Sequence, residues 1–302
     1  MRQFVARVFP GVEFQLERTQ TGNSTPVYRV RCPADVFYLR LAETLEASLE
    51  PEVRIHALLR ERGARVPEVV YFEPLDESLQ RSVLMTRAIA GGPLTEHCNG
   101  LALPEILHEA GRDLALINAV SVTGFGWIRR DQGVSQRLVA EHLSRQTWSL
   151  EYIDSVRSLE RAGELSAAEV SGAVAAIERW VTWPSGEQEC LAHGDFDVSH
   201  IFQHDGRYTG IIDFGEVRGA DRLYDLAHFH LHDGETLHEF QLPHLLSGYR
   251  EVLPLPPNRV QQIKLLAQVI GIRALARSLR HPPGADRAWL RDRLRTLLAD
   301  GE

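Results

Sequence analysis

Hydrophobic and polar positions alternate over several short stretches of the first ninety residues. Stretches with this alternation, or with many β-branched and aromatic residues, are typical of strands. The segments that show it are 13–19, 26–32, 36–41, 68–72 and 82–86. Between the third and the fourth, the apolar residues of 50–62 recur at helical spacing and predict a helix. The first part of the chain is therefore expected to be a small strand-rich unit with one helix.

Beyond a Gly- and Pro-containing stretch at 90–93, the spacing of the hydrophobic residues becomes helical. Gly and Pro interrupt regular structure, so we place the end of the first unit near residue 90. Ile106 and Ala110 begin the next helical pattern. Further helices are expected over 138–159, 166–180, 260–279 and 288–298. The pattern thus predicts one unit over residues 1–90 and a mainly helical one over residues 91–302.

One predicted hairpin interrupts the helical part. Two short apolar strands flank Asp205-Gly206, a dipeptide typical of tight hairpin turns. The hairpin lies between Asp195 and Asp213, and its formation would bring both carboxylates to the same side. One carboxylate could then meet a substrate hydroxyl while the other holds a divalent cation. Phosphoryl transfer requires this division of roles.

Composition narrows the classes of partner. The chain has 302 residues, 44% of them hydrophobic, which is enough for a substantial core. A net charge of −8 argues against binding to nucleic acid or to an anionic membrane surface, because such binders normally carry a basic excess. Three widely spaced cysteines indicate neither a disulfide framework nor a cysteine zinc site. With no apolar run typical of a secretion signal or a spanning helix, we expect a cytoplasmic protein.

Three stretches of the chain resemble a known family. They are His193-Gly194-Asp195 with a candidate ligand five residues on, Ile211–Gly215, and Asp221–Ala227. Together they resemble the aminoglycoside phosphotransferase family, whose fold is similar to that of protein kinases, and the 18 residues from Asp195 to Asp213 fit that fold. The resemblance implies a bilobal α+β fold. A small antiparallel-sheet N-terminal lobe over 1–90 would bind nucleotide, and a larger, mostly helical C-terminal lobe over 91–302 would carry the catalytic loop, metal site and substrate pocket.

Each acidic residue of these stretches has an expected role. Asp195 is the candidate catalytic base, because a carboxylate within hydrogen-bond reach of a hydroxyl can orient it and accept its proton. Asp213 is the candidate Mg²⁺ ligand, since this cation prefers carboxylate oxygen. The resemblance implies that His193 and Asp225 support the catalytic loop. For an isolated His-Gly-Asp we would favour a simple turn, but the hairpin and the second aspartate favour a functional site.

His200 departs from the family pattern, which has Asn as the second metal ligand at this place. Imidazole is a poor ligand for Mg²⁺. Either the second metal is lost or loosely held, or His200 orients a phosphate or a metal-bound water. A histidine also stands at the matching place in the macrolide phosphotransferase branch, which the motif resembles. The change is therefore compatible with activity, and we keep His200 as a candidate metal-site residue.

The expected nucleotide-binding residues come from the first unit. Arg40 stands where a kinase-like fold carries its strand Lys, and Glu52 on the following helix is its natural partner. A surface Arg and a solvated Glu are the alternative. Ser24 and Thr25 belong to a stretch that resembles the family's phosphate-covering loop, although it has one Gly and no P-loop pattern. The resemblance also places Thr86 and Ala88 in the segment whose backbone contacts the base.

We therefore predict an enzyme that moves the γ-phosphate of ATP or GTP to a hydroxyl of a small molecule, with Mg²⁺ as cofactor. The resemblance implies an antibiotic acceptor of the aminoglycoside or macrolide type, with resistance as the outcome. The alternative acceptor is a metabolite such as choline or homoserine. The expected assembly is a monomer or a homodimer.

Two other classes of function stay open. Arg40 and His200 could be signs of a nucleotide-binding pseudokinase, although an intact Asp195 and Asp213 argue against this. A two-metal phosphoesterase built from His193, Asp195, Asp213 and His228 would leave the strand-rich first unit without a role. The four histidines at 228, 230, 232 and 238 raise the alternative of a zinc or manganese site. On a helix only His228 and His232 share a face, so these histidines are interpreted as structural or exposed.

Overall fold

The computed structural model describes most of the chain. The described residues are 1–19, 27–94, 102–130, 137–183, 189–237, 239–256 and 259–299. Ser24 and Thr25 lie outside them.

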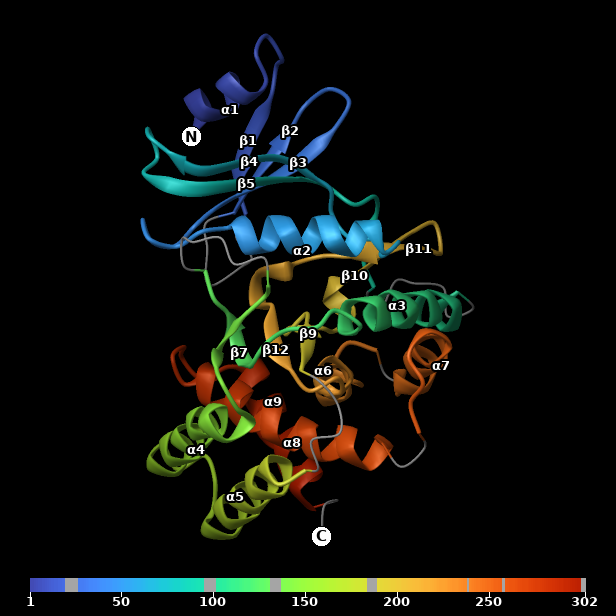
Figure 1. Ribbon diagram of the computed structural model, residues 1–302. Coiled ribbons are helices and arrows are strands. Elements are labelled where there is room, and N and C mark those ends of the chain that lie inside the picture. Colours follow the sequence, from blue (N-terminus) through green and yellow to red (C-terminus); the bar gives the residue numbers. More distant parts are fainter. Residues whose placement is uncertain are drawn as a thin grey trace.

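A five-stranded antiparallel sheet forms the N-terminal part (Figure 1). Its strands are β1 (Gln15–Arg18), β2 (Val27–Arg31), β3 (Val36–Leu41), β4 (Val69–Asp76) and β5 (Arg81–Arg87). Their order in the sheet is β1-β2-β3-β5-β4, so each strand pairs with a close neighbour in sequence or across one helical connection. The five predicted strands are confirmed.

Helix α1 (Arg2–Val8) precedes the sheet and had not been predicted. Phe4 and Val5 are buried and belong to the same hydrophobic cluster as Leu39 and Met85 of the sheet. Only two of the seven helical residues are buried, so the periodic signal in the sequence is short. The helix owes its place to packing on the sheet rather than to a strong local pattern.

Helix α2 (Glu50–Glu61) lies between the sheet and the remainder of the molecule in Figure 1. Pro51 occupies its first turn, where a missing N–H costs nothing. Ile55 and Leu59 are fully buried and belong to the large hydrophobic cluster that also contains Leu94 and Ile106. One face of the helix thus packs with side chains from beyond residue 90. The division of the chain at residue 90 stays a prediction.

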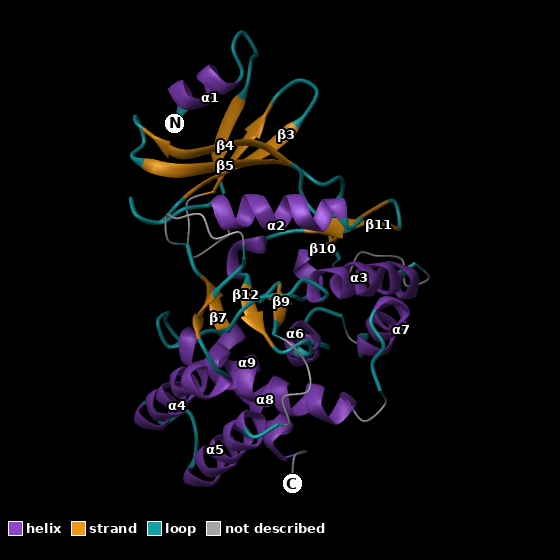
Figure 2. Cartoon of the chain, in the orientation of Figure 1, coloured by secondary structure: helices purple, strands orange, loops and turns teal. Residues whose placement is uncertain are grey.

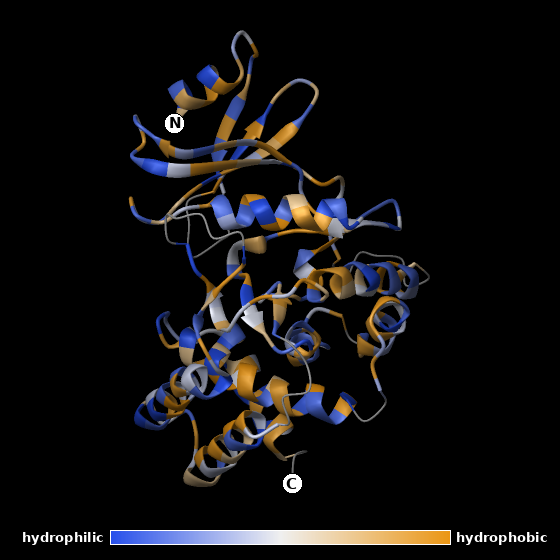
Figure 3. Ribbon diagram, viewed as in Figure 1, coloured by the Kyte–Doolittle hydropathy of each residue, from blue (hydrophilic) through white to orange (hydrophobic). Residues whose placement is uncertain are grey.

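The remainder of the chain is mostly helical (Figure 2), which confirms the predicted α+β class. Its helices are α3 (Leu103–Asn118), α4 (Arg145–Arg161), α5 (Ala167–Val181), α6 (Tyr224–His232), α7 (Leu242–Val252), α8 (Arg259–Ser278) and α9 (Ala285–Ala299). Hydrophobic and hydrophilic residues are interspersed along helices such as α4 and α5 (Figure 3), as expected for helices with one buried face. Trp148, Tyr152 and Trp180 are fully buried and contact one another edge to face.

The helix predicted over 138–159 is wrong in its first part. Residues Ala140–His142 form strand β8, which pairs with β7 (Phe125–Ile128). The helix begins only after Ser144, whose side chain accepts the N–H of Thr147 in a capping box. Tertiary pairing with β7 thus decides the conformation of the stretch before the cap.

Two further small sheets carry the loops of interest. Strands β10 (Ile201–His204) and β11 (Arg207–Ile211) form the predicted hairpin, and β6 (Gly92–Pro93) adds a third strand. Asp205 and Gly206 have φ of 50° and 73°, the conformation that a tight hairpin turn of the I′ type requires. Strand β9 (Cys190–Ala192) pairs with β12 (Arg218–Ala220), which itself pairs with β7. The loops that follow β9 and β11 bear Asp195 and Asp213.

We predict that Gly248→Ala destabilises the protein. A Cβ at this position of α7 would lie 1.8 Å from the carbonyl oxygen of His108 in α3, so the two helices must move apart. Overpacking of this kind costs about 1–3 kcal/mol. The free energy of unfolding in urea measures the effect.

The matched control is Gly172→Ala on α5, where the nearest atom to the added Cβ lies 4.0 Å away. Because Gly is a poor helix former, this variant should be more stable by about 0.5–1 kcal/mol. A Gly248→Ala protein as stable as the wild type would contradict the packing of α3 against α7.

Candidate active site

The loop after β9 turns sharply at Gly194. This residue has φ of +88°, and a Cβ there would lie 2.0 Å from the carbonyl oxygen of Glu216. Only glycine meets both demands without strain. The Gly of the His-Gly-Asp motif therefore lets the loop approach the segment after Asp213 closely.

A buried carboxylate holds the same loop from the other side. Asp225, on the first turn of α6, is fully buried. Its two oxygens accept the backbone N–H groups of His193, at 2.9 Å, and Gly194, at 2.8 Å. The side-chain amide of Asn118 donates a third bond, at 2.9 Å. Charge-assisted bonds of this kind are stronger than neutral ones, so Asp225 fits the supporting role expected of it.

The ring of His193 connects the loop to the strand that leads to Asp213. Its Nε2 lies 2.8 Å from the carbonyl oxygen of Ile212, which can only accept, so Nε2 carries the proton. Its Nδ1 accepts the backbone N–H of Asp195 at 3.4 Å. Burial lowers the pKa of His193, which favours this neutral ring. His193 thus contacts both segments that bear the candidate catalytic aspartates, as a supporting residue should.

Asp213 stands at the end of the hairpin in a left-handed conformation, with φ of 64°. Such backbone is unusual for residues other than Gly, although Asp tolerates it better than most. Its Oδ1 accepts the N–H of Gly215 at 3.3 Å, and the side chain is 54% exposed. The carboxylate is therefore fixed locally and open to solvent, as a site for a hydrated cation requires.

His200 lies between the two aspartates. Its Nδ1 is 2.6 Å from the backbone carbonyl oxygen of Asp195, and its Nε2 is 3.9 Å from Oδ2 of Asp213. Burial would lower the pKa of His200, but the neighbouring carboxylates of Asp197, Asp195 and Asp213 raise it. One imidazole therefore lies against both loops. Its Nδ1 donates to the backbone of the Asp195 loop, so this nitrogen does not face a metal.

The carboxylate of Asp195 is 42% exposed and lies beside a buried histidine. Oδ1 is 3.4 Å from Nε2 of His228. Burial would raise the pKa of Asp195, but electrostatic interaction with His228, His200 and His193, and then with Arg218, lowers it to about 2. Burial lowers the pKa of His228 to about 4. At neutral pH the carboxylate is ionised, as a group that orients and then deprotonates a hydroxyl should be.

Arg40 and Glu52 meet as expected, and a second arginine joins them. Nη1 of Arg40 lies 2.7 Å from Oε2 of Glu52, and Nη2 of Arg130 lies 2.9 Å from Oε1. The Arg130 guanidinium also donates to the carbonyl oxygen of Gly215 at 3.0 Å. Nη2 of Arg40 would lie 3.2 Å from a Cβ at Gly215. Sheet, helix α2 and the Asp213 segment thus converge on one buried glutamate.

Two more expected nucleotide-binding residues, Thr86 and Ala88, lie at the end of β5 and just after it. Thr86 is paired with Tyr38 in β3. The N–H of Ala88 donates to the carbonyl oxygen of Val36 at 2.8 Å. The carbonyl oxygen of Ala88 is thus the group left to contact a base, and the roles of Thr86 and Ala88 stay predictions.

Two functional candidates carried no signal in the sequence analysis, and a third was named there only as a ligand of the phosphoesterase alternative. Arg130 lies between strands, outside any motif. Arg218 is buried, donates to the hydroxyl of Tyr224 at 3.0 Å, and pairs with Glu216 at 2.8 Å. His228 had been assigned a structural role, and only the fold shows that it faces Asp195. The first two could have been suspected only from their arginine side chains.

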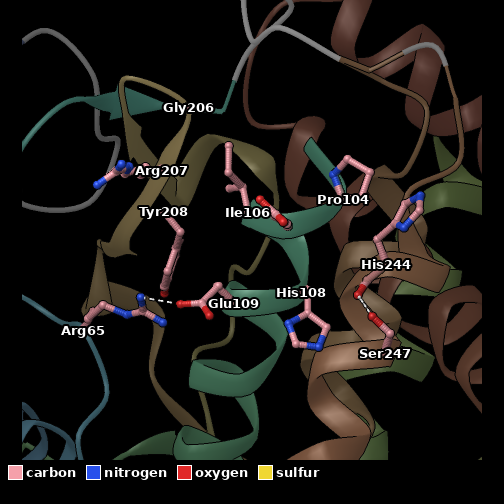
Figure 4. Close-up of a pocket in the computed structure, with 11 residues that line it drawn as sticks. Arg65, Pro104, Ile106, His108, Glu109, Gly206, Arg207, Tyr208, His244 and Ser247 are labelled. Carbon is pink, nitrogen blue, oxygen red and sulfur yellow. Dashed lines mark hydrogen bonds and ion pairs between the residues drawn. The ribbon is translucent and has the colours of Figure 1, made fainter. Parts of the chain in front are cut away.

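A separate cavity of about 750 Å³ lies beside the turn of the hairpin. Figure 4 shows Arg65, Arg207 and Tyr208 on one side of it and His244 and Ser247 on the other. None of the candidate catalytic or nucleotide-binding residues within the described ranges lines this cavity. It is distinct from the site around the two aspartates.

Comparison with known proteins agrees with the geometry. The model of the phosphotransferase enzyme family matches residues 15–261, which include both aspartates and the Arg40–Glu52 pair. The chain belongs to this family. The predicted phosphotransferase and its resemblance to the aminoglycoside phosphotransferases are confirmed. No curated protein sequence matches the chain.

Solved structures share the whole fold. A thermostable mutant of aminoglycoside phosphotransferase APH(4)-Ia is 18% identical, with a TM-score of 0.72 over 100% of this chain and 99% of that one. The GDP complex of aminoglycoside 2'-phosphotransferase-IIIa is 18% identical, with a TM-score of 0.67 over 99% and 96%. A putative fructosamine-3-kinase from Thermobifida fusca YX-ER1 is 19% identical, with a TM-score of 0.65 over 99% of both chains. The kinase-like bilobal class is thus confirmed.

The phosphoesterase alternative does not fit this site. Within the described ranges, the potential metal ligands grouped with Asp195 are Asp197 and His228, and they include neither His193 nor Asp213. Both ring nitrogens of His193 are engaged by the backbone.

Over the same ranges, the helices are all too short or too polar to span a membrane.

We predict that Asp225→Asn destabilises the protein and lowers kcat. The amide nitrogen must face a backbone N–H, so at least one buried donor loses its acceptor, at a cost of about 1–3 kcal/mol. Urea unfolding and turnover measure the two effects. The control is Asp154→Asn, which removes an ion pair whose side chains are 68–70% exposed and should change stability by less than about 0.5 kcal/mol. Equal stability of the two variants would refute the bracing role of Asp225.

Proposed function

We propose that this protein is a kinase that transfers the γ-phosphate of ATP or GTP to a hydroxyl of a small molecule. The observation that supports it is the placement of Asp195 and Asp213 on either side of His200, one carboxylate beside a buried histidine and the other open to solvent. Phosphoryl transfer rests on positioning and charge neutralisation, which this pair can supply.

Asp195 is the proposed catalytic base. Its ionised carboxylate accepts a hydrogen bond from the acceptor hydroxyl and so orients it toward the γ-phosphate. As the bond from the acceptor oxygen to phosphorus forms and the bond from phosphorus to the nucleoside diphosphate breaks, the proton passes to the carboxylate. The low pKa of Asp195 keeps it ionised before this step at neutral pH.

The residues of the Asp213 segment suit Mg²⁺. Asp213 offers carboxylate oxygen in an exposed position, and Nε2 of His200 faces it. We assign Asp213 as the protein ligand and His200 as a neighbour that orients a phosphate or a metal-bound water, since Mg²⁺ prefers oxygen and keeps several waters. When bound, Mg²⁺ would neutralise phosphate charge.

Arg40 is the proposed phosphate-binding cation of the nucleotide site. Its pairing with Glu52 fixes the guanidinium beside the Asp213 segment. An Arg fork can contact phosphate oxygens and a carboxylate together. Similar structures hold ADP or AMP-PNP in APH(4)-Ia and GDP in aminoglycoside 2'-phosphotransferase-IIIa, which supports a nucleoside triphosphate as donor. Ser24 and Thr25 keep their proposed role in covering the phosphates.

An antibiotic of the aminoglycoside or macrolide type is the proposed acceptor, and resistance the proposed outcome. A complex of APH(4)-Ia with ADP and hygromycin B supports the first type, and His200 the second. A metabolite is the second candidate, because putative fructosamine-3-kinases share the fold over nearly the whole chain. A pseudokinase is disfavoured by the two intact aspartates. We further propose a cytoplasmic monomer or homodimer that binds neither nucleic acid nor membrane.

The proposed activity can be tested with purified protein, Mg²⁺ and either ATP or GTP. Incubation with a panel of aminoglycosides, macrolides, fructosamines, choline and homoserine, followed by mass spectrometry, should show one phosphate added to one class. Asp195→Asn should lower kcat at least about 100-fold, because the amide cannot accept the proton, and should leave nucleotide affinity unchanged.

The matched control is Asp205→Asn, at the hairpin turn, where the side chain is 88% exposed and Asn tolerates positive φ. Its turnover should equal that of the wild type. Full activity of Asp195→Asn would overturn the assignment of the base. If none of the tested compounds becomes phosphorylated, the proposed kinase activity is contradicted.

Arg40→Ala should raise KM for the nucleotide by about ten- to 100-fold, the equivalent of one lost charge-assisted hydrogen bond. Arg40→Lys should fall between this variant and the wild type, because it keeps the charge and loses the fork. Arg31→Ala is the control, since Arg31 lies on the neighbouring strand β2 and its side chain is 46% exposed. Steady-state kinetics with varied ATP give the comparison, and an unchanged KM in Arg40→Ala would exclude phosphate contact.

A further inference from the structure

Asp195 and two neighbouring residues form a group that could hold a metal ion. One atom each from Asp195, Asp197 and His228 lies within 4.8 Å of the others. Two residues come from the loop after β9 and the third from α6. Ligands of a tetrahedral zinc ion, at about 2.0–2.2 Å from the metal, lie about 3.4 Å apart. Small rotations of the side chains would therefore close the site.

The orientation of His228 leaves one ring nitrogen facing the carboxylate of Asp195. Nδ1 lies 3.1 Å from the carbonyl oxygen of Phe196, which can only accept, so Nδ1 carries the proton of the neutral ring. Nε2 then has a bare lone pair, yet it faces Oδ1 of Asp195, another acceptor, at 3.4 Å. The side chain is 8% exposed and packs beside the ring of His232, so it is not free to turn away. A metal ion could take the place of the proton that Nε2 and Oδ1 otherwise share.

The second carboxylate has a free oxygen. Asp197 accepts the N–H and the hydroxyl of Ser199 with the same atom, Oδ1, and its closest approach to His200 also uses Oδ1. Oδ2 has no such contact among the described residues. Two ionised carboxylates and a neutral imidazole give the site a charge of −2, which favours a divalent cation.

We propose that Asp195, Asp197 and His228 form a binding site for Zn²⁺ or a similar transition-metal ion, separate from the Mg²⁺ site at Asp213. Imidazole with carboxylates suits zinc, whereas Mg²⁺ prefers oxygen alone. The bond from Nδ1 to the Phe196 carbonyl is the second contact that ligating histidines typically make. A zinc ion here occupies the carboxylate of Asp195. If Asp195 is the base of the proposed kinase, the ion inhibits turnover.

A second histidine-carboxylate group in the described chain is a useful comparison. Glu141, His142 and Glu151 also lie close together. There, Nε2 of His142 is 2.6 Å from one oxygen of Glu151, and Arg273 lies 3.0 Å from the other. The arginine neutralises the carboxylate and occupies it, so this group should not compete for the ion.

Binding of Zn²⁺ to the full chain, freed of metal by a chelator and without nucleotide, tests the site by calorimetry. Co²⁺ in place of Zn²⁺ gives a visible absorption that reports its ligands. The wild type should bind one ion. His228→Gln and Asp197→Asn should each weaken binding at least about tenfold, while Asp213→Asn and His142→Ala should bind as the wild type does. Circular dichroism verifies that each variant is folded.

If the wild type binds Zn²⁺ no more tightly than His228→Gln and Asp197→Asn do, the proposed site is wrong. Loss of Zn²⁺ binding in Asp213→Asn alone would place the ion at the Mg²⁺ site instead. Once an acceptor is known, Zn²⁺ should inhibit wild-type turnover at saturating Mg²⁺ and nucleotide. With each variant's rate expressed as a fraction of its own rate without zinc, Asp197→Asn should need at least about tenfold more Zn²⁺ than the wild type for the same inhibition. The binding arm decides the site even if the kinase proposal fails. Tight binding without inhibition would refute the inhibitory role.

Discussion

The buried carboxylate of Asp225 is the contact on which the site depends. It accepts the N–H groups of His193 and Gly194 and so sets the direction in which the chain leaves β9. The ring of His193 then fixes the distance between this loop and Ile212, the residue before Asp213. A fully buried charge is costly unless its hydrogen bonds are satisfied, and here three donors satisfy it. The geometry of both aspartates follows from that constraint.

A second buried carboxylate joins the sheet to this arrangement. Glu52 on α2 receives Arg40 from β3 and Arg130 from the segment after β7, and Arg130 continues to the carbonyl oxygen of Gly215. Residues that are distant in sequence thus share one acceptor. Movement of the sheet relative to the loop that bears Asp213 would break at least one of these bonds, so the candidate nucleotide site and the Asp213 segment are positioned together.

Two histidines of α6 lie next to each other near the carboxylate of Asp195. His228 contacts the carboxylate. His232 packs beside His228, with the ring centroids 4.9 Å apart, and pairs with Glu235 at 2.6 Å. Burial lowers the pKa of His228, whereas the pKa of His232 is raised, because its bond to Glu235 outweighs burial. The pKa values of two adjacent rings are therefore shifted in opposite directions. The protonation of these two histidines affects whether a hydroxyl or a cation binds beside Asp195.

The five strands, helix α2, the Asp205-Gly206 hairpin and the motif stretches could be predicted from the amino-acid sequence, because each rests on local periodicity, turn chemistry or a short spacing. It also identified the family, which the comparisons confirm. Tertiary structure alone decided that α1 packs on the sheet and that residues 140–142 form a strand. It also decided that Arg130 joins Glu52 and that His228 faces Asp195. Those outcomes depend on contacts between residues tens of positions apart, and no local pattern records which side chains a fold brings together.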